Sequence, residues 1–420
     1  METILIKNIY AVGQNKICDI LIEDGKIKRI ADSIESDGKV IDGTGLTAFP
    51  SFFDMHVHFR DPGQTHKEDI LTGADSAIHG GFTGVACMPN TNPVVDSPET
   101  VKYILDKAKL TGIKVYPIVT VTKGMDGKIL CDYEELKKAG AIAISEDGKP
   151  VKNAEIMRQA LEKSNENGML IISHCEDLDI INKGIINKGE ISRKLNVPGM
   201  DRASEDSITA REIALAYSQD ARIHIAHVST EGSMALVRDA KRRGVKVTCE
   251  TAPHYFLLTQ EKLLSRDADY RMNPPLREEK DRLAVIDAIA DGTVDCIVTD
   301  HAPHAKNEKE VFEKAPNGIV GLETSFAGVT TGLYHTGRIT LERIAQLMSE
   351  NPRKILGLPV EKIAENADAN ITITDLNEEW TVDPEKLHSK SKNTAFKGMK
   401  LKGKVKALIS DGKLLFDEIN

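Results

Sequence analysis

Residues 52–63 read FFDMHVHFRDPG, and this stretch is the best guide to both the fold and the chemistry of the chain. It begins as an apolar β-strand and then places His56 and His58 two positions apart. Successive side chains of a strand point to opposite faces, so the two imidazoles share one face, and Arg60 continues the alternation. Imidazole is a common zinc ligand, so the pair forms half of a metal site. The stretch therefore predicts metal chemistry at the end of a strand.

The composition of the whole chain is that of an ordinary globular protein. Its 420 residues are 40% hydrophobic, and the net charge is −9. This length allows two domains or one large barrel with an accessory piece, and the acidic balance argues against a nucleic-acid or anionic membrane surface. The sequence contains neither a run of roughly 20 apolar residues, as a membrane span needs, nor a signal peptide. The six cysteines are scattered and are expected to be reduced, which predicts a cytoplasmic protein.

Both ends of the chain are patterned as short strands with tight turns. Asp24-Gly25, between two such strands, is a strong hairpin signal. We expect residues 1–50 and 358–420 to build one small β-sandwich domain, although two separate caps would give a similar pattern. The expected strands are 3–7, 18–23, 26–30, 39–42, 371–374 and 404–410.

The middle of the chain, residues 51–357, alternates between apolar runs and amphipathic helical stretches. Ser97 before Pro98 marks one helix start, and Gly168 and Gly244 mark two helix ends. Repeated strand–helix alternation over about 300 residues predicts a (β/α)8 TIM-like barrel. A doubly wound open sheet is the alternative, but no glycine-rich phosphate loop follows the first strand. The apolar runs are 49–58, 83–88, 114–120, 141–145, 169–173, 222–228, 245–250 and 295–299.

Metal-binding side chains follow several of these runs. In such a barrel the C-terminal strand ends build the active site. A single histidine at this rim would be read as a core residue, and an isolated His-x-His pair is as often a pair of surface residues as a pair of metal ligands. Four histidines and two aspartates at one rim, however, predict a metal centre. Two metals suit the set, with a carboxylate bridging them, and Glu146 and Lys149 are alternatives to Asp147 as the bridge. The expected ligands are His56, His58 and Asp300 for one metal, His174 and His227 for the other, and Asp147 between them.

Seven motifs together carry a resemblance to a known family. The chain resembles the amidohydrolase superfamily and, within it, the bacterial type I dihydroorotases. The His-x-His motif alone is typical of the whole superfamily. Arg60, Asn90 and the NPPLR motif narrow the resemblance to the dihydroorotases. The matching stretches, in order along the barrel, are DMHVHFR (54–60), MPNTNP (88–93), SHCE (173–176), AHVS (226–229), NPPLR (273–277), TDHAPH (299–304) and GIVGLET (318–324).

The resemblance implies reversible cyclisation of N-carbamoyl-L-aspartate to L-dihydroorotate, a step of pyrimidine biosynthesis that uses one or two zinc ions per chain. Asp300 matches the residue that binds metal and carries a proton from the attacking hydroxide to the leaving amide nitrogen. Arg60 offers a planar, bidentate partner for the carboxylate beside the ring. The implied substrate contacts are His58, Arg60, Asn90 and His304, with Asn273 and the backbone around Asn317 and Gly318 for the ring amide.

Two departures and two rival functions accompany the resemblance. Many superfamily members bridge their metals with a carboxylated lysine where this chain has the shorter Asp147, and Ser51 replaces a usual glycine. A hydantoinase or allantoinase is one rival, but its substrates do not present a ring carboxylate to Arg60. A non-catalytic homologue that acts as a partner subunit is the other. The resemblance also implies a homodimer and association with aspartate carbamoyltransferase, and the charged residues 305–317 are expected to form an active-site lid.

Overall fold

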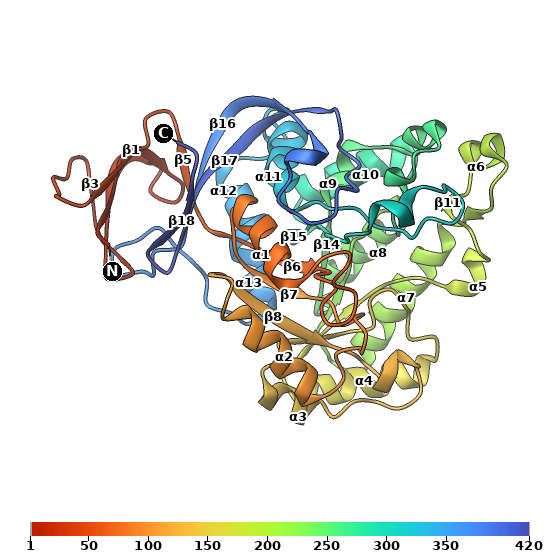
Figure 1. The fold of residues 1–420 in the computed structure, drawn as a ribbon. Helices are drawn as coiled ribbons and strands as arrows, with labels where there is room; N and C mark the ends of the chain where they lie inside the picture. The colour runs from red at the N-terminus through yellow and green to blue at the C-terminus, as the bar shows by residue number, and fades with distance from the viewer. Residues whose placement is uncertain (1, 420) are drawn as a thin grey trace.

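The computed structural model describes residues 2–419 and shows a barrel with a sheet at its side (Figure 1). Eight strands form the barrel in the order β15-β14-β13-β10-β9-β8-β7-β6, and every pair is parallel. A bridge between Val57 and His301 joins the two ends of this sheet. The (β/α)8 prediction is therefore confirmed. The strands are β6 (Phe52–Val57), β7 (Phe82–Cys87), β8 (Lys114–Val119), β9 (Ala143–Ser145), β10 (Leu170–Ser173), β13 (Ile223–Ile225), β14 (Val247–Thr251) and β15 (Cys296–Ile297).

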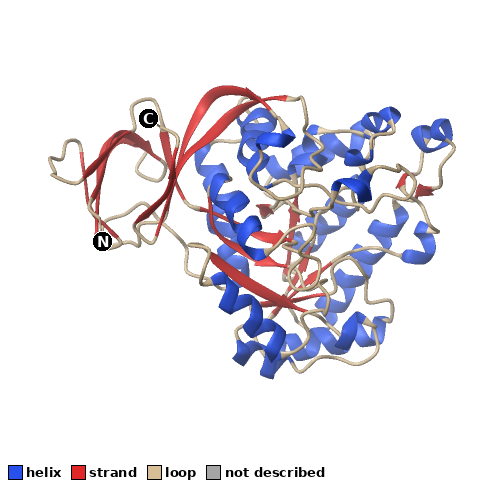
Figure 2. Cartoon of the chain, in the orientation of Figure 1, coloured by secondary structure: helices blue, strands red, loops and turns tan. Residues whose placement is uncertain are grey.

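Helices surround the barrel, as the secondary-structure colours of Figure 2 show. Ser97 caps α2 by accepting a hydrogen bond from the Thr100 amide, as expected. Gly168 and Gly244 follow the ends of α4 and α8 with φ of 58° and 78°, a conformation that favours glycine. Among residues 2–419, no helix combines the length and the apolar character that a bilayer span requires. The helices are α1 (Ile70–His79), α2 (Pro98–Ala108), α3 (Tyr133–Ala139), α4 (Ala154–Glu166), α5 (Leu178–Ile181), α6 (Glu190–Leu195), α7 (Ala203–Ser218), α8 (Glu231–Arg242), α9 (Pro253–Leu257), α10 (Glu279–Ala290), α11 (Leu322–Val329), α12 (Leu341–Ala345) and α13 (Asn351–Leu356).

The second sheet combines strands from both ends of the chain. Its order is β18-β17-β16-β5-β1-β2-β3, with β4 beside β1, and β5 pairs with β16 so that Ala48 lies opposite Ile373. The alternative of two separate caps is therefore wrong. Asp24 and Gly25 have φ of 50° and 81°, as the hairpin between β2 and β3 requires. The strands are β1 (Ile4–Ala11), β2 (Lys16–Glu23), β3 (Lys26–Ala31), β4 (Lys39–Asp42), β5 (Thr47–Pro50), β16 (Ile371–Thr381), β17 (Lys400–Ser410) and β18 (Lys413–Asp417).

An apolar cluster fills the barrel beneath the site. Phe53 and Met55 of β6 contribute to it, together with Ile118 of β8 and Ile172 of β10. These side chains are almost completely buried, and a packed barrel interior leaves the C-terminal rim as the place for chemistry. A long segment between β16 and β17, residues 382–399, leaves the second sheet and contacts loops at that rim.

Candidate active site

The end of β6 changes register where the site begins. Met55 belongs to the apolar cluster inside the barrel, yet the next residue, His56, faces the rim. The pairing of β6 with β7 shifts between Asp54 and Val57, and the Asp54 carboxylate accepts hydrogen bonds from the amides of His56 and Thr299, at 3.0 Å each. Asp54 therefore fixes the irregular backbone that presents His56 to the site.

Asp147 lies at the centre of the four predicted histidines. Its Oδ1 is 3.5 Å from His56 Nε2, 3.4 Å from His174 Nδ1 and 3.4 Å from His227 Nε2. Its other oxygen, Oδ2, is 3.3 Å from His58 Nε2. One carboxylate thus contacts all four imidazoles, three through Oδ1 and one through Oδ2, which is an arrangement expected of a bridging ligand.

Asp300 completes the cluster from the end of β15. Its Oδ1 lies 3.2 Å from His58 Nε2 and 3.5 Å from His56 Nε2. Burial raises the pKa of the Asp300 carboxyl, but the hydrogen bond and charge of His58 and the charge of His56 outweigh burial and lower it. The carboxylate is therefore ionised at neutral pH, as a general base must be.

The two alternative bridges lie elsewhere. Glu146 points out of the cluster and accepts hydrogen bonds from the amides of Val121 and Thr122, at 2.9 and 3.0 Å. Lys149 is exposed. Of the three candidates at the end of β9, Asp147 alone has its side chain among the histidines.

The donor set fits a divalent metal. Within residues 2–419, three buried polar atoms of the cluster have no hydrogen-bond partner: His56 Nε2, His227 Nδ1 and Asp147 Oδ1. Burial raises the pKa of Asp147, but the neighbouring histidines hold it well below its ordinary value, so the carboxylate is charged. A buried carboxylate and imidazole without partners are costly unless a cation binds them. His56, Asp147 and His227 form one potential metal-binding group, and His56, His58 and Asp300 form another.

Glu250, at the end of β14, is a functional residue that the sequence interpretation missed. Its Oε1 accepts a hydrogen bond of 2.5 Å from His56 Nδ1, and its Oε2 accepts one of 3.1 Å from His224 Nε2. A carboxylate behind a metal-binding histidine fixes the ring and its tautomer and leaves Nε2 free for the metal. The carboxylate ends the seventh apolar run, so its place at a strand end was the available signal.

The predicted carboxylate contacts Arg60 and His304 lie side by side. Arg60 Nη2 is 3.4 Å from His304 Nε2, and Arg60 Nε donates to the Pro303 carbonyl at 3.2 Å. His304 Nε2 donates to the Asn317 carbonyl at 2.9 Å. Burial and the positive charges of Arg60 and Lys67 lower the pKa of His304 to about 2, so the imidazole is neutral. Together they place a buried guanidinium cation beside a neutral imidazole whose N–H is directed at the Asn317 carbonyl.

The two predicted asparagine contacts border the metal cluster. Asn90 Oδ1 accepts from His58 Nδ1 at 2.8 Å, which leaves His58 Nε2 facing Asp147 and Asp300. Asn273 Nδ2 donates to Glu176 Oε1 at 2.7 Å, and Glu176 Oε2 lies 3.2 Å from His174 Nε2. Glu176, in the SHCE motif, has no role predicted from the sequence, and in the structure it connects Asn273 to His174.

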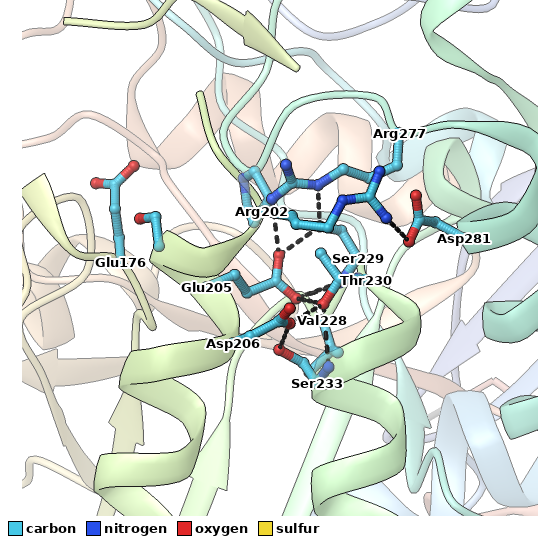
Figure 3. A network of polar contacts seen from close by, with 12 residues as sticks. Glu176, Arg202, Glu205, Asp206, Val228, Ser229, Thr230, Ser233, Arg277 and Asp281 are labelled. Atoms are coloured by element: carbon cyan, nitrogen blue, oxygen red, sulfur yellow. Dashed lines mark hydrogen bonds and ion pairs between the residues drawn. The ribbon is translucent and has the colours of Figure 1, made fainter. Parts of the chain in front are cut away.

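A second polar network, shown in Figure 3, supports the loop that carries His227. Glu205 of α7 accepts hydrogen bonds from the amides of Ser229 and Thr230, at 2.9 and 3.2 Å, and pairs with Arg277 Nη2 at 3.1 Å. Arg277 Nε also donates to Ser229 Oγ at 3.0 Å. The arginine of the NPPLR motif therefore acts through the side chains of Glu205 and Ser229 to support the backbone two residues beyond His227.

Residues 305–317, the expected lid, are held against neighbouring backbone by Lys309. They contain a short 3-10 helix, Lys306–Lys309, whose last side chain is buried. Lys309 Nζ donates to three carbonyls, those of Arg271, Pro316 and Gly318, at 3.3, 2.9 and 3.1 Å. Gly318 is thereby held close to His304, at the rim that carries the other sequence-predicted site residues.

Comparison with known proteins agrees with this geometry. Residues 47–415 match the amidohydrolase family, and the chain belongs to that family. The dihydroorotase of Geobacter metallireducens is 46% identical over 408 residues, which cover 96% of both chains. The dihydroorotase of Acetivibrio thermocellus is 48% identical over 421 residues, 99% of both chains.

Solved structures share the fold at lower identity. The L-hydantoinase (dihydropyrimidinase) from Arthrobacter aurescens matches with a TM-score of 0.87 at 23% identity and covers 100% of this chain and 97% of that one. A D-hydantoinase matches with a TM-score of 0.84 at 26% identity. The family and the dihydroorotase relatives together identify the chain as a metal-dependent cyclic amidohydrolase.

Proposed function

We infer that the chain is a dihydroorotase, which interconverts L-dihydroorotate and N-carbamoyl-L-aspartate in pyrimidine biosynthesis. The observation that carries this inference is the Arg60–His304 pair, at 3.4 Å, on the rim that also holds the metal-type cluster. A cyclic amide with a carboxylate beside the ring satisfies both, because the carboxylate pairs with Arg60 while the amide lies over the cluster. The dihydroorotase relatives, at 46–48% identity over nearly the whole chain, support the same substrate.

The proposed cofactor is zinc, with two ions per chain. His56, His58 and Asp300 would hold one, His174 and His227 the other, and Asp147 both. This proposal is supported by the two overlapping ligand groups that share His56 and by the nitrogen-rich donor set, which suits zinc. Bound there, the metals would activate water and polarise the amide carbonyl.

The side chains would then divide the work of ring opening. Water oxygen adds to the ring amide carbon while Asp300 takes a water proton. The carbon–nitrogen bond breaks, and Asp300 returns that proton to the leaving nitrogen, which becomes part of a terminal ureido group. The new carboxyl group ionises and releases the second water proton to solvent. Arg60, Asn90 and His304 would bind the ring carboxylate, and Asn273, Asn317 and Gly318 the ring amide. His58 would contact both metal and substrate.

The organisation of the protein in the cell is part of the same proposal. We propose a cytoplasmic homodimer that associates with aspartate carbamoyltransferase, whose product is the substrate for ring closure. Residues 1–50 and 358–420 would form one domain and residues 51–357 the other, since these boundaries fall between β5 and β6 and just after α13.

Ring opening of L-dihydroorotate by the purified, zinc-loaded chain tests the function, with hydantoin and allantoin assayed in parallel. Of the three rings, we expect only dihydroorotate to be opened. This activity should be lost when a chelator is added and should return when zinc is restored. Turnover of hydantoin or allantoin instead would contradict the role of Arg60. If none of the three rings is opened, the catalytic proposal fails for the isolated chain, and adding aspartate carbamoyltransferase distinguishes a partner-dependent enzyme from a non-catalytic subunit.

A further inference from the structure

We propose that Asn393 is a positioning residue for the proposed carboxylate-binding residues Arg60 and His304, called here the carboxylate pocket. Asn393 itself lies outside the barrel, on the segment that joins β16 to β17. It would act by holding His304 and Gly318 in the relative positions that bind the substrate. The inference rests on the proposed function for its substrate, but its structural basis is independent of it. In Figure 1 this segment is dark blue and runs from the second sheet toward the barrel.

Asn393 connects two backbone segments beside the carboxylate pocket, residues 302–304 and residues 317–320. Its Oδ1 accepts a hydrogen bond of 3.1 Å from the His304 amide. Its Nδ2 donates to the carbonyls of Ala302 and Gly318, at 3.3 and 3.0 Å. Its own carbonyl accepts from the Val320 amide at 3.0 Å. A single buried amide therefore satisfies three backbone groups that secondary structure leaves unpaired, which fixes their separation.

The separation that Asn393 sets has little tolerance. Gly318 has φ of 138°, and a Cβ at this position would lie 2.7 Å from Ala302 Cβ and 3.0 Å from His304 Nε2. His304 and the 317–318 backbone are thus in close contact, with the imidazole N–H directed at the Asn317 carbonyl. A shift of a few tenths of an ångström between these two segments would move the His304 imidazole relative to Arg60.

The same segment also holds the opposite side of the pocket. Ser391 Oγ donates to the Lys67 carbonyl at 2.6 Å, and Ser389 Oγ donates to Glu68 Oε2 at 2.5 Å. Lys67 and Glu68 belong to the loop that follows Arg60. One segment therefore contacts both the Arg60 loop and the His304 loop, and Asn393 is its contact with the latter.

The consequence for catalysis is specific to binding. Arg60 and His304 contact the carboxylate, which keeps its charge throughout the reaction, so these contacts contribute equally to substrate and transition state. Loss of such binding raises KM and leaves kcat nearly unchanged. Proton transfer by Asp300 does not involve Asn393.

The test compares Asn393→Ala and Asn393→Asp with Asn377→Ala, an exposed asparagine of β16 in the same hairpin. Asn393→Asp keeps the acceptor for the His304 amide but opposes two carbonyls with a carboxylate oxygen. Both Asn393 variants should raise the KM for L-dihydroorotate about 10-fold, or about 1.4 kcal/mol, with kcat within about threefold. Asn377→Ala should match the wild type. An unchanged KM in both Asn393 variants, or a fall in kcat alone, would overturn the proposal.

Amide hydrogen exchange separates this proposal from the function on which it rests. In the Asn393 variants, the amides of residues 302–304 and 317–320 should exchange faster, while those of the barrel strands should not. This readout needs no turnover. If wild-type protein does not open dihydroorotate, the proposed function fails while the exchange result still decides whether Asn393 holds these segments. Unchanged exchange in both segments would refute the positioning role even in an active enzyme.

Discussion

Two neighbouring buried polar clusters, one around Asp147 and one around Glu205, differ in how their charged groups are compensated. Some of their members are only a few residues apart in sequence. His227 belongs to the metal-type cluster, whereas Ser229 and Thr230 belong to the network of Glu205. Around Asp147, several buried atoms have no hydrogen-bond partner within residues 2–419. Around Glu205, an arginine and four amide or hydroxyl donors satisfy both carboxylate oxygens. The Asp147 cluster therefore fits a bound cation, whereas Glu205 already has its counter-charge in Arg277.

The difference shows what each cluster contributes. A buried carboxylate needs compensation for its lost hydration. In the Glu205 network, the chain itself supplies this compensation and thereby fixes the backbone after His227. In the Asp147 cluster, the chain leaves compensation to a cation, so part of its stability is exchanged for reactivity. Substitutions in the Asp147 cluster should therefore affect turnover, and those in the Glu205 network should affect folding.

The largest expected effect is on turnover. Asp300→Asn should lower kcat for dihydroorotate by about 10⁴-fold, because the amide cannot accept the proton and is a poorer metal ligand. The thermal midpoint should stay within a few degrees of the wild type. Steady-state assays and a thermal scan of the same zinc-loaded sample measure both. Near-normal turnover would exclude Asp300 as the proton carrier.

In the Glu205 network, a substitution should lower stability more than turnover. Glu205→Ala leaves Arg277 buried without its counter-charge and should lower the free energy of unfolding by about 3–5 kcal/mol. Chemical denaturation measures this loss. Turnover per folded molecule, measured well below the melting transition, should fall far less than in Asp300→Asn. A stable but inactive Glu205→Ala protein would contradict the separation of the two roles.

The sequence predicted the fold because strand periodicity and helix caps are local signals. The eight apolar runs correspond to β6–β10 and β13–β15, and Ser97, Gly168 and Gly244 mark helix boundaries as expected. The pairing of β5 with β16 was only one of two alternatives, since contacts between residues more than 300 positions apart leave no local pattern. The contacts of Lys309 with three backbone carbonyls were not predicted because a lysine in a charged loop reads as an exposed residue.

The site was predictable where ligands follow strand ends, but not where a residue acts through another. His56, His58, His174, His227 and Asp300 follow this rule, and the structure places Asp147 rather than Glu146 among them. Glu250 was missed although it lies at a strand end, and Glu205, on a helix, was missed because a carboxylate that holds another side chain has no distinguishing motif. Asn393 was missed because its partners come from loops far away in the sequence.

Arg60 extends the comparison to positive charge. Arg277 has a carboxylate partner, whereas Arg60 forms no ion pair within residues 2–419, and burial lowers its pKa to about 10 although Asp300 and Asp147 oppose this shift. Arg60→Met should raise the KM for dihydroorotate about 30-fold, or about 2 kcal/mol, through loss of a charged hydrogen bond. Arg277→Met, the matched control, should lower stability instead. An unchanged KM in Arg60→Met would mean that the carboxylate is bound elsewhere.

The smallest expected effect is the pH dependence of the Glu205 contribution. Burial raises the pKa of Glu205, but the charge of Arg277 and the donors of Ser229 outweigh it, so the folded-state pKa lies below the ordinary value of 4.5. A carboxylate with a lowered pKa stabilises the fold fully above its unfolded pKa, and that stabilisation is lost as the pH falls through the folded value. The stability difference between wild type and Glu205→Gln should therefore be constant from pH 8 to about 5 and shrink below about 4.5. All other titratable groups are common to the two proteins, so denaturation across this range isolates Glu205. A difference that grows in acid would mean that folding raises the pKa of Glu205, and the comparison between a satisfied and an unsatisfied cluster would fail.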